Sequence, residues 1–138
     1  MDSADEILGF EEPGTEVDQL AYAVLGAAIE VHSELGPGHN ESAYEKALCI
    51  ELTNRGIPFV HQSRFRLMYK GQEVGTGRLD LLVGNLLVIE IKSVEQLAPI
   101  HTSQTVAYLR ATGKNLALLI NFNVRRVKDG VKRVARTH

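Results

Sequence analysis

Residues 78–92 constrain the fold most, because two apolar runs here carry charges and meet at a turn. The runs Leu79–Val83 and Leu86–Ile91 are short, rich in branched side chains and separated by Gly84-Asn85. This pattern predicts a hairpin of two strands that are buried on both faces. The charged residues are Asp80, Glu90 and Lys92. Because a lone buried carboxylate costs several kcal/mol, the grouping implies mutual pairing, a bound metal, or both.

The length of the loop decides whether these charges can meet. A strict two-residue loop would leave Asp80 on one face of the sheet and Glu90 and Lys92 on the other. A three-residue loop, Val83–Asn85, with its last residue left-handed, pairs Asp80 with Val88 and puts all three charges on one face. Asp80 and Glu90 are then diagonal neighbours, roughly 7 to 8 Å apart at the backbone and within reach of one cation. We therefore predict a three-residue loop or a bulge.

Length and composition predict one domain over residues 1–138, since 44% hydrophobic residues suffice for a core. Cys49 is the only cysteine, which excludes an internal disulfide and fits a reducing compartment. The acidic start, Met1–Glu12, lacks a long apolar core, and no stretch approaches 18 apolar residues. We therefore expect neither secretion nor a membrane span, and a cytoplasmic location.

The net charge of -2 hides an asymmetry between the two halves of the chain. Residues 1–62 hold 12 acidic and 2 basic side chains, net -10, whereas residues 63–138 hold 5 acidic and 13 basic ones, net +8. A basic half that carries buried carboxylates suits a polyanion held near a metal. Ordinary solvated surface charge is the alternative.

Caps and turns predict the order α-α-β-β-β-α-β after a loosely ordered acidic lead, residues 1–14. The expected helices are 15–35, about 40–55, and 99–113. The expected strands are Phe59–Tyr69, Val74–Val83, Leu86–Ile91 and Leu116–Phe122. Gly75 and Gly77 predict a bulge or a close backbone approach in the second strand. The basic tail after Asn123 is expected to form an edge strand or to contact phosphates.

Two helices carry polar residues in informative places. In the second helix, Glu41 lies three residues before Tyr44 on the expected inward stripe, whereas Glu45 can point outward. The alternative for Glu41 is that it only complements the helix dipole. In the third helix a polar stripe recurs at i, i+3 and i+7, formed by His101, Gln104 and Tyr108. An ordinary solvent face is the alternative for this stripe.

The element order, with Asp80 on one strand and Glu90-Ile91-Lys92 on the next, resembles the core of the PD-(D/E)XK nuclease superfamily. Gly38, Glu41 and Tyr44 have the spacing of the motif that defines the GxxExxY protein family within it. The likeness covers roughly residues 18 to 133. Arg78-x-Asp80 and Gln104-x-x-x-Tyr108 follow in the matching order, although Leu79 stands where the superfamily name has Pro.

The resemblance implies an α/β fold with a restriction-endonuclease-like core, a central mixed sheet flanked by helices. It assigns catalysis to Asp80, Glu90 and Lys92, and metal binding to Glu41, Asp80 and Glu90. Gln104 and Tyr108 match a motif that lines the site in exonuclease-like branches. We expect substrate positioning by these two and by Arg78, Tyr44 and His101; for His101 a hydrogen-bonded supporting or surface role is the alternative.

The implied reaction is hydrolysis of phosphodiester bonds in DNA, in preference to RNA. Because the reaction develops negative charge on oxygen, a hard dication held by carboxylates can stabilise it. With oxygen ligands and no thiolate cluster, Mg²⁺ or Mn²⁺ is favoured over structural zinc. One rival is a nucleic-acid-binding or assembly module that retains the fold without turnover; another is a purely structural charge network. The size of the core also admits a homodimer.

Overall fold

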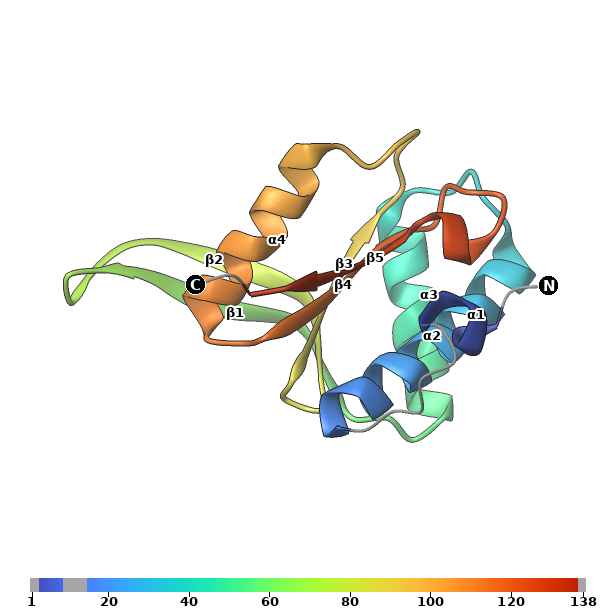
Figure 1. Ribbon diagram of the computed structural model, residues 1–138, viewed down its shortest axis with the longest axis horizontal. Coiled ribbons are helices and arrows are strands. Elements are labelled where there is room, and N and C mark those ends of the chain that lie inside the picture. Colours follow the sequence, from blue (N-terminus) through green and yellow to red (C-terminus); the bar gives the residue numbers. More distant parts are fainter. Residues whose placement is uncertain (1–2, 9–14, 137–138) are drawn as a thin grey trace.

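The computed structural model describes residues 3–8 and 15–136, which form helices around one mixed sheet (Figure 1). The α-helices are α1 (Ala4–Leu8), α2 (Glu16–Leu35), α3 (Glu41–Asn54) and α4 (Pro99–Thr112). The strands are β1 (Phe59–Tyr69), β2 (Gln72–Val83), β3 (Leu87–Lys92), β4 (Leu116–Asn121) and β5 (Val131–Ala135), with a short 3-10 helix, η1 (Val127–Asp129), before β5. No helix in the described ranges is long and apolar enough to cross a membrane.

The helices begin and end where the capping residues predict. The Thr15 side chain accepts a hydrogen bond from the Asp18 N–H, and the Asn40 side chain accepts one from the Ala43 N–H. Each of these bonds satisfies an N–H that the helix itself leaves unpaired. Helix α4 starts at Pro99 and ends at the left-handed Gly113.

The strands follow the order β1-β2-β3-β4-β5, with only the β3–β4 pair parallel. The parallel pair needs a crossover, and α4 supplies it. Strand β5 is antiparallel to β4 at the edge of the sheet, which confirms the expected edge strand in the basic tail. The architecture is the α/β arrangement of a mixed sheet between helices that the sequence predicts.

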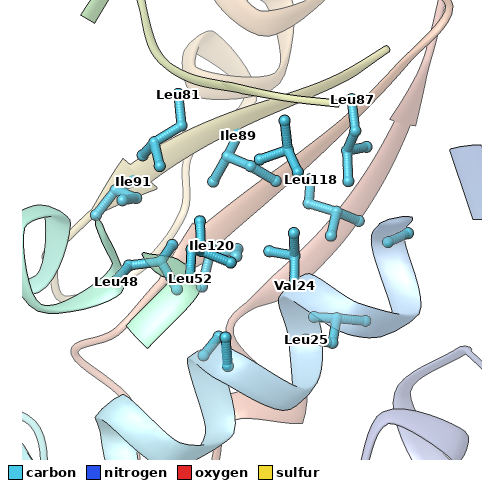
Figure 2. Close-up of a cluster of buried hydrophobic side chains, with 14 of the residues drawn as sticks. Val24, Leu25, Leu48, Leu52, Leu81, Leu87, Ile89, Ile91, Leu118 and Ile120 are labelled. Carbon is cyan, nitrogen blue, oxygen red and sulfur yellow. The ribbon is translucent and has the colours of Figure 1, made fainter. Parts of the chain in front are cut away.

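Each face of the sheet packs against its own helices. The larger cluster joins alternate residues of β2, β3 and β4 to α2 and α3. Figure 2 shows this cluster, with Leu81, Ile89 and Leu118 of the sheet facing Val24 and Leu52 of the helices. The second cluster lies on the opposite face under α4 and contains Leu79, Leu82, Val88, Leu109, Ala117, Leu119 and Val134.

The β2–β3 loop has three residues, as predicted, but it lies one residue further along the chain. Val83 pairs with Leu87, so the loop is Gly84-Asn85-Leu86, and our expected pairing of Asp80 with Val88 is wrong. Gly84 (φ 57°) and Asn85 (φ 60°) are both left-handed, and the Leu86 N–H donates to the Val83 carbonyl. This register buries Val83 and Leu87 completely. Each residue of β2 therefore pairs two positions further along β3 than expected. A shift of two residues leaves every side chain on the same face, so Asp80, Glu90 and Lys92 still share one.

The β1–β2 hairpin bends in the middle. Phe59 packs against the larger cluster, but Phe65 packs against the second one, on the opposite face. Residues of the same parity should keep one face, so both strands must turn between these positions. Gln62 is left-handed here (φ 57°), and the flanking pairs His61–Leu81 and Ser63–Leu79 place it across from Asp80.

The prediction for Gly75 and Gly77 is confirmed. The register shifts next to Leu67, opposite Gly75, as a bulge requires. At Gly77 a Cβ would lie 2.2 Å from the Phe65 ring, so only glycine lets the ring lie flat on the strand. Beyond the bend the hairpin extends away from α2 and α3 (Figure 1).

Acidic residues of α1 and α2 lie against the basic tail. Part of the expected loose lead is the helix α1, because Ala4 and Ile7 pack on the larger cluster; residues 9–14 lie outside the described residues. Glu6 pairs with Arg126 at 3.2 Å, and Asp18 pairs with Arg133 at 2.5 Å. The surface-charge explanation of the asymmetry therefore holds for this part of the molecule.

Candidate active site

Asp80 and Glu90 meet where β2 and β3 stop pairing through their backbones. The Asp80 N–H donates to the Glu90 carboxylate at 2.8 Å, and the Ile91 N–H donates to the Asp80 carboxylate at 2.7 Å. Two side chains thus take the places of backbone carbonyls beyond the pair Leu81–Ile89. The predicted meeting of the two carboxyl groups is confirmed, and they face each other directly instead of diagonally.

Burial at this site disfavours the ionised forms of Asp80 and Glu90. Burial raises the pKa of Glu90 to about 8, and the neighbouring Asp80 adds to the rise. Burial likewise raises the pKa of Asp80 to about 6, with further contributions from Glu45 and Glu41. Glu90 is 4% exposed, so water cannot disperse its charge. The pair therefore retains a proton near neutral pH, which a bound cation would displace.

Lys92 supplies the positive charge of the site. It is half-buried at the end of β3, two residues after Glu90 and on the same face of that strand. Its ammonium group opposes the rise in pKa at both Asp80 and Glu90. Asp80, Glu90 and Lys92 therefore lie together, as the sequence predicts, although their catalytic role stays a prediction.

Helix α4 brings one residue of its polar stripe to the carboxyl pair. Burial raises the pKa of the Tyr108 hydroxyl, and the charges of Glu90 and Asp80 add to the rise, so the phenol lies within the electrostatic reach of the pair. Gln104 is exposed one turn earlier, and its role stays a prediction. His101 accepts a hydrogen bond from the Ala98 N–H through Nδ1. That bond caps the start of α4 and favours the supporting role for His101.

Helix α3 faces the site with a different acid from the one expected. Glu41 is exposed at the first turn, whereas Glu45 is 9% exposed. Our expectation that Glu45 points outward is wrong. Glu45 raises the pKa of Asp80 more strongly than Glu41 does and also raises that of Glu90. The predicted metal-binding role of Glu41 remains a prediction.

Glu45 also holds the bend in β1, a role that we did not predict. Its carboxylate accepts hydrogen bonds from the His61 ring and, at 2.6 Å, from the Gln62 side chain. Gln62 lies opposite Asp80, so this contact supports the turn of the strands at the site. The signal was present in the sequence, because Glu45 precedes Leu48 by three residues and therefore lies on the buried stripe.

Tyr44 anchors the Gly-rich turn before α3. It is fully buried, and its ring stacks on Phe122 with centroids 4.7 Å apart. Its hydroxyl donates to the Gly36 carbonyl at 2.5 Å and accepts from the His39 N–H at 3.1 Å. Its predicted part in substrate positioning stays a prediction. Its burial makes it a support for the entry to α3.

Arg78 lies outside the carboxyl pair, on the exposed face of β2. It is two residues before Asp80 and pairs across the hairpin with Arg64. Its predicted contact with substrate stays a prediction.

The donor set fits a hard divalent cation. Within residues 3–8 and 15–136 no three His, Cys, Asp or Glu side chains form a complete metal cage. However, Mg²⁺ is commonly held by one or two carboxylates, with water and substrate phosphates completing its shell. The buried, incompletely neutralised Asp80 and Glu90 supply such a pair.

Comparisons with known proteins agree with this geometry. A family model described as the PD-(D/E)XK nuclease superfamily matches residues 18–134. No match is found among curated proteins. Among solved structures, the alkaline exonuclease LHK-Exo from Laribacter hongkongensis aligns with a TM-score of 0.52 and 14% identity, over 99% of this chain and 77% of that chain. LHK-Exo in complex with dAMP aligns with a TM-score of 0.52 and 13% identity, over 97% of this chain and 75% of that chain. The fold is therefore restriction-endonuclease-like.

Proposed function

This chain belongs to the PD-(D/E)XK nuclease superfamily, and from that premise we propose that it hydrolyses phosphodiester bonds in DNA, in preference to RNA, with a divalent cation. The observation that carries the proposal is the buried pair of Asp80 and Glu90 beside Lys92. A carboxyl pair that costs folding energy in the core, with a lysine near it, suits a reaction that develops negative charge.

Asp80 and Glu90 would hold the cation, with Glu41 and Glu45 on α3 as the further acids nearest to it. Mg²⁺ or Mn²⁺, when bound, would polarise the phosphate and lower the pKa of the attacking water. The pair must lose its retained proton to bind, so affinity for the cation should rise with pH.

Lys92 and Tyr108 would act on the substrate. The Lys92 ammonium can donate hydrogen bonds to a nonbridging phosphate oxygen or to the attacking water, where it offsets the developing charge. A tyrosine phenol carries its proton at neutral pH, and burial raises the pKa of Tyr108 further, so its O–H can donate to a phosphate as well. Gln104 lies one turn away on the same stripe and could extend these contacts.

Two observations support nucleic acid, and DNA first, as the substrate. The fold is shared with LHK-Exo, whose solved complex contains the deoxyribonucleotide dAMP. Arg78, next to the site, is an exposed cation suited to phosphate.

We also propose that the chain is a member of the GxxExxY family. The tyrosine of that motif, Tyr44, is buried here and supports the turn before α3. We likewise propose, from the sequence, that the protein forms a homodimer and is located in the cytoplasm.

One experiment tests the proposed reaction. The purified protein is incubated with linear, nicked and single-stranded DNA and with RNA, in Mg²⁺, Mn²⁺ or EDTA. Asp80→Asn and Lys92→Met should each lower the rate at least about 100-fold, because each removes a charge that acts on the transition state. Lys46→Met, an exposed lysine on α3, is the matched control and should cleave normally. Cleavage that persists in EDTA or in both site variants would contradict the proposal.

A binding or assembly module without turnover is the second candidate. It is favoured by the backbone N–H groups that already engage Asp80 and Glu90. Salt-sensitive binding of nucleic acid, with no cleavage of any substrate in either cation, would favour this candidate.

A further inference from the structure

The protruding part of the β1–β2 hairpin contains an open groove of about 600 Å³. Its lining residues are Arg64, Phe65, Arg66, Thr76, Gly77 and Arg78. They all come from these two strands, in the part of the hairpin that extends away from α2 and α3 (Figure 1). Three arginines therefore meet on a surface that contains no acidic lining residue.

The three arginines share one face of the hairpin. Phe65 packs on the α4 face, where its ring meets Tyr108 edge-on with centroids 5.3 Å apart. Neighbouring residues of a strand point to opposite faces, so Arg64 and Arg66 lie on the face away from α4. Arg78 pairs directly with Arg64 and lies on the same face. The aromatic contact behind the groove holds this part of the hairpin in place.

Folding alone gives no reason for this arrangement. Like charges directly across a strand pair are destabilising, and Arg64 faces Arg78 in that way. Neither of these two arginines forms an ion pair in the part of the chain that the structure describes. Arg66 has only a long contact of 3.9 Å with Glu73, and both side chains are largely exposed. Arg126 and Arg133 of the tail, by contrast, have acidic partners.

We propose that this groove holds the sugar-phosphate backbone of a nucleic acid on its path to the carboxyl pair. Guanidinium groups bind phosphate through paired hydrogen bonds, and an anion would relieve the repulsion between Arg64 and Arg78. Arg78 is two residues from Asp80, about 6.6 to 6.8 Å along the strand, which links the groove to the site. Contacts of this kind position the chain without selecting a base sequence. The inference rests on the proposed function, because it assigns the approach to that site.

Binding measurements separate the groove from general basic charge. Fluorescently labelled single-stranded DNA, duplex DNA and RNA of one length are titrated in EDTA at several salt concentrations. The test protein is the double variant Arg64→Gln, Arg66→Gln. The control is Arg125→Gln, Lys132→Gln, which removes two exposed charges from the tail and leaves the same net charge. Circular dichroism and thermal melting check that both variants fold.

The groove variant should bind at least tenfold more weakly at about 0.1 M salt, and its slope of log affinity against log salt should fall by roughly 1.4 to 1.8. The control should bind within twofold of the unaltered protein. The melting temperature of the groove variant should not fall, because its substitutions remove the repulsion between Arg64 and Arg78. Equal weakening of both variants would overturn the proposal, as would normal binding by the groove variant. If the groove variant binds nucleic acid normally but its mass in sedimentation differs from that of the unaltered protein, the groove is a contact between two copies of the chain. That result would also overturn the proposal.

Cleavage assays keep the two proposals distinguishable. If the protein is a nuclease, the groove variant should raise KM at least tenfold and leave kcat within twofold, since it removes only binding. Weakened binding by the groove variant, with no cleavage by the unaltered protein, would retain the groove and reject hydrolysis. Cleavage that depends on Asp80, together with normal binding by the groove variant, would retain hydrolysis and reject the groove.

Discussion

At the scale of single residues, the candidate site depends on two carboxyl groups whose burial is unfavourable for their ionised forms. The buried Glu90 carboxyl group loses its contact with water, accepts one backbone N–H and lies beside the Asp80 carboxyl group. Burial raises its pKa to about 8. A core built only for stability would place an apolar side chain there. The protein retains an unfavourable group where a cation and a phosphate could use it, which is typical of functional sites.

Glu90→Gln should change how stability depends on pH. Between the ordinary value of 4.5 and about 8, the folded protein binds more protons at Glu90 than the unfolded chain does. The free energy of unfolding should therefore fall as pH rises through this range. In EDTA at pH 8 the variant should be more stable than the unaltered protein, by on the order of a few kcal/mol.

Urea denaturation in EDTA from pH 5 to pH 8 measures this difference. Glu95→Gln, which removes an exposed acid, is the control and should leave the profile unchanged. Parallel pH profiles for Glu90→Gln and the unaltered protein would show that Glu90 has no raised pKa.

At the scale of elements, the bend in the β1–β2 hairpin determines where Asp80 lies. The left-handed Gln62, held by Glu45 from α3, turns the strands opposite Asp80. Beyond the bend, Phe65 lies flat on Gly77 and meets Tyr108 of α4. One strand pair therefore contacts α3 on one face and α4 on the other, and both helices bring a polar residue to the carboxyl pair.

Gly77→Ala should be destabilising, by about 1 to 3 kcal/mol, because its Cβ would lie 2.2 Å from the Phe65 ring and push it from its place. Gly75→Ala is a matched control on the same strand. Its Cβ would approach only Leu67, at 3.9 Å, so its effect should stay near 0.5 kcal/mol or below. Chemical denaturation of both variants provides the test. A cost at Gly75 equal to that at Gly77 would point to strand propensity instead of the aromatic contact.

At the scale of the whole molecule, the charge asymmetry divides into two parts. Acidic residues of α1 and α2 neutralise part of the basic tail through Glu6–Arg126 and Asp18–Arg133. The hydrogen bond from Arg133 is the main reason why the pKa of Asp18 is lowered. In the hairpin groove, Arg64 and Arg78 form no ion pair with any described residue, and Arg66 has only the long contact with Glu73, so this part of the molecule carries positive charge that its neighbours do not neutralise.

The tail ion pairs should contribute little to stability and should be sensitive to salt. A double-mutant cycle of Asp18→Asn and Arg133→Gln should give a coupling energy of about 0.2 to 1 kcal/mol at low salt, since both groups are partly exposed. The coupling should shrink in about 1 M NaCl, where screening acts over a few ångströms. Denaturation of the four proteins at both salt concentrations measures it. A coupling that is unchanged by salt would mean that the contact is not mainly ionic.

Local patterns in the chain were enough to predict α2, α3, α4, the strands of the sheet and the meeting of Asp80 with Glu90. Caps such as Thr15 and Asn40, stops such as Gly113, and the alternation along residues 79–91 act over a few residues, so they can be read without tertiary contacts. The shared face of Asp80, Glu90 and Lys92 follows from the same alternation.

Only the tertiary structure decided which long-range contacts complete the site. The inward side of α3 selected Glu45 and left Glu41 exposed, because helix rotation is set by packing of Leu48 and Leu52 against the sheet. The burial of Tyr44 and the bend at Gln62 likewise depend on residues far away in the chain. Side-chain spacing determines what can share a face, whereas the competition for core space determines which face is buried.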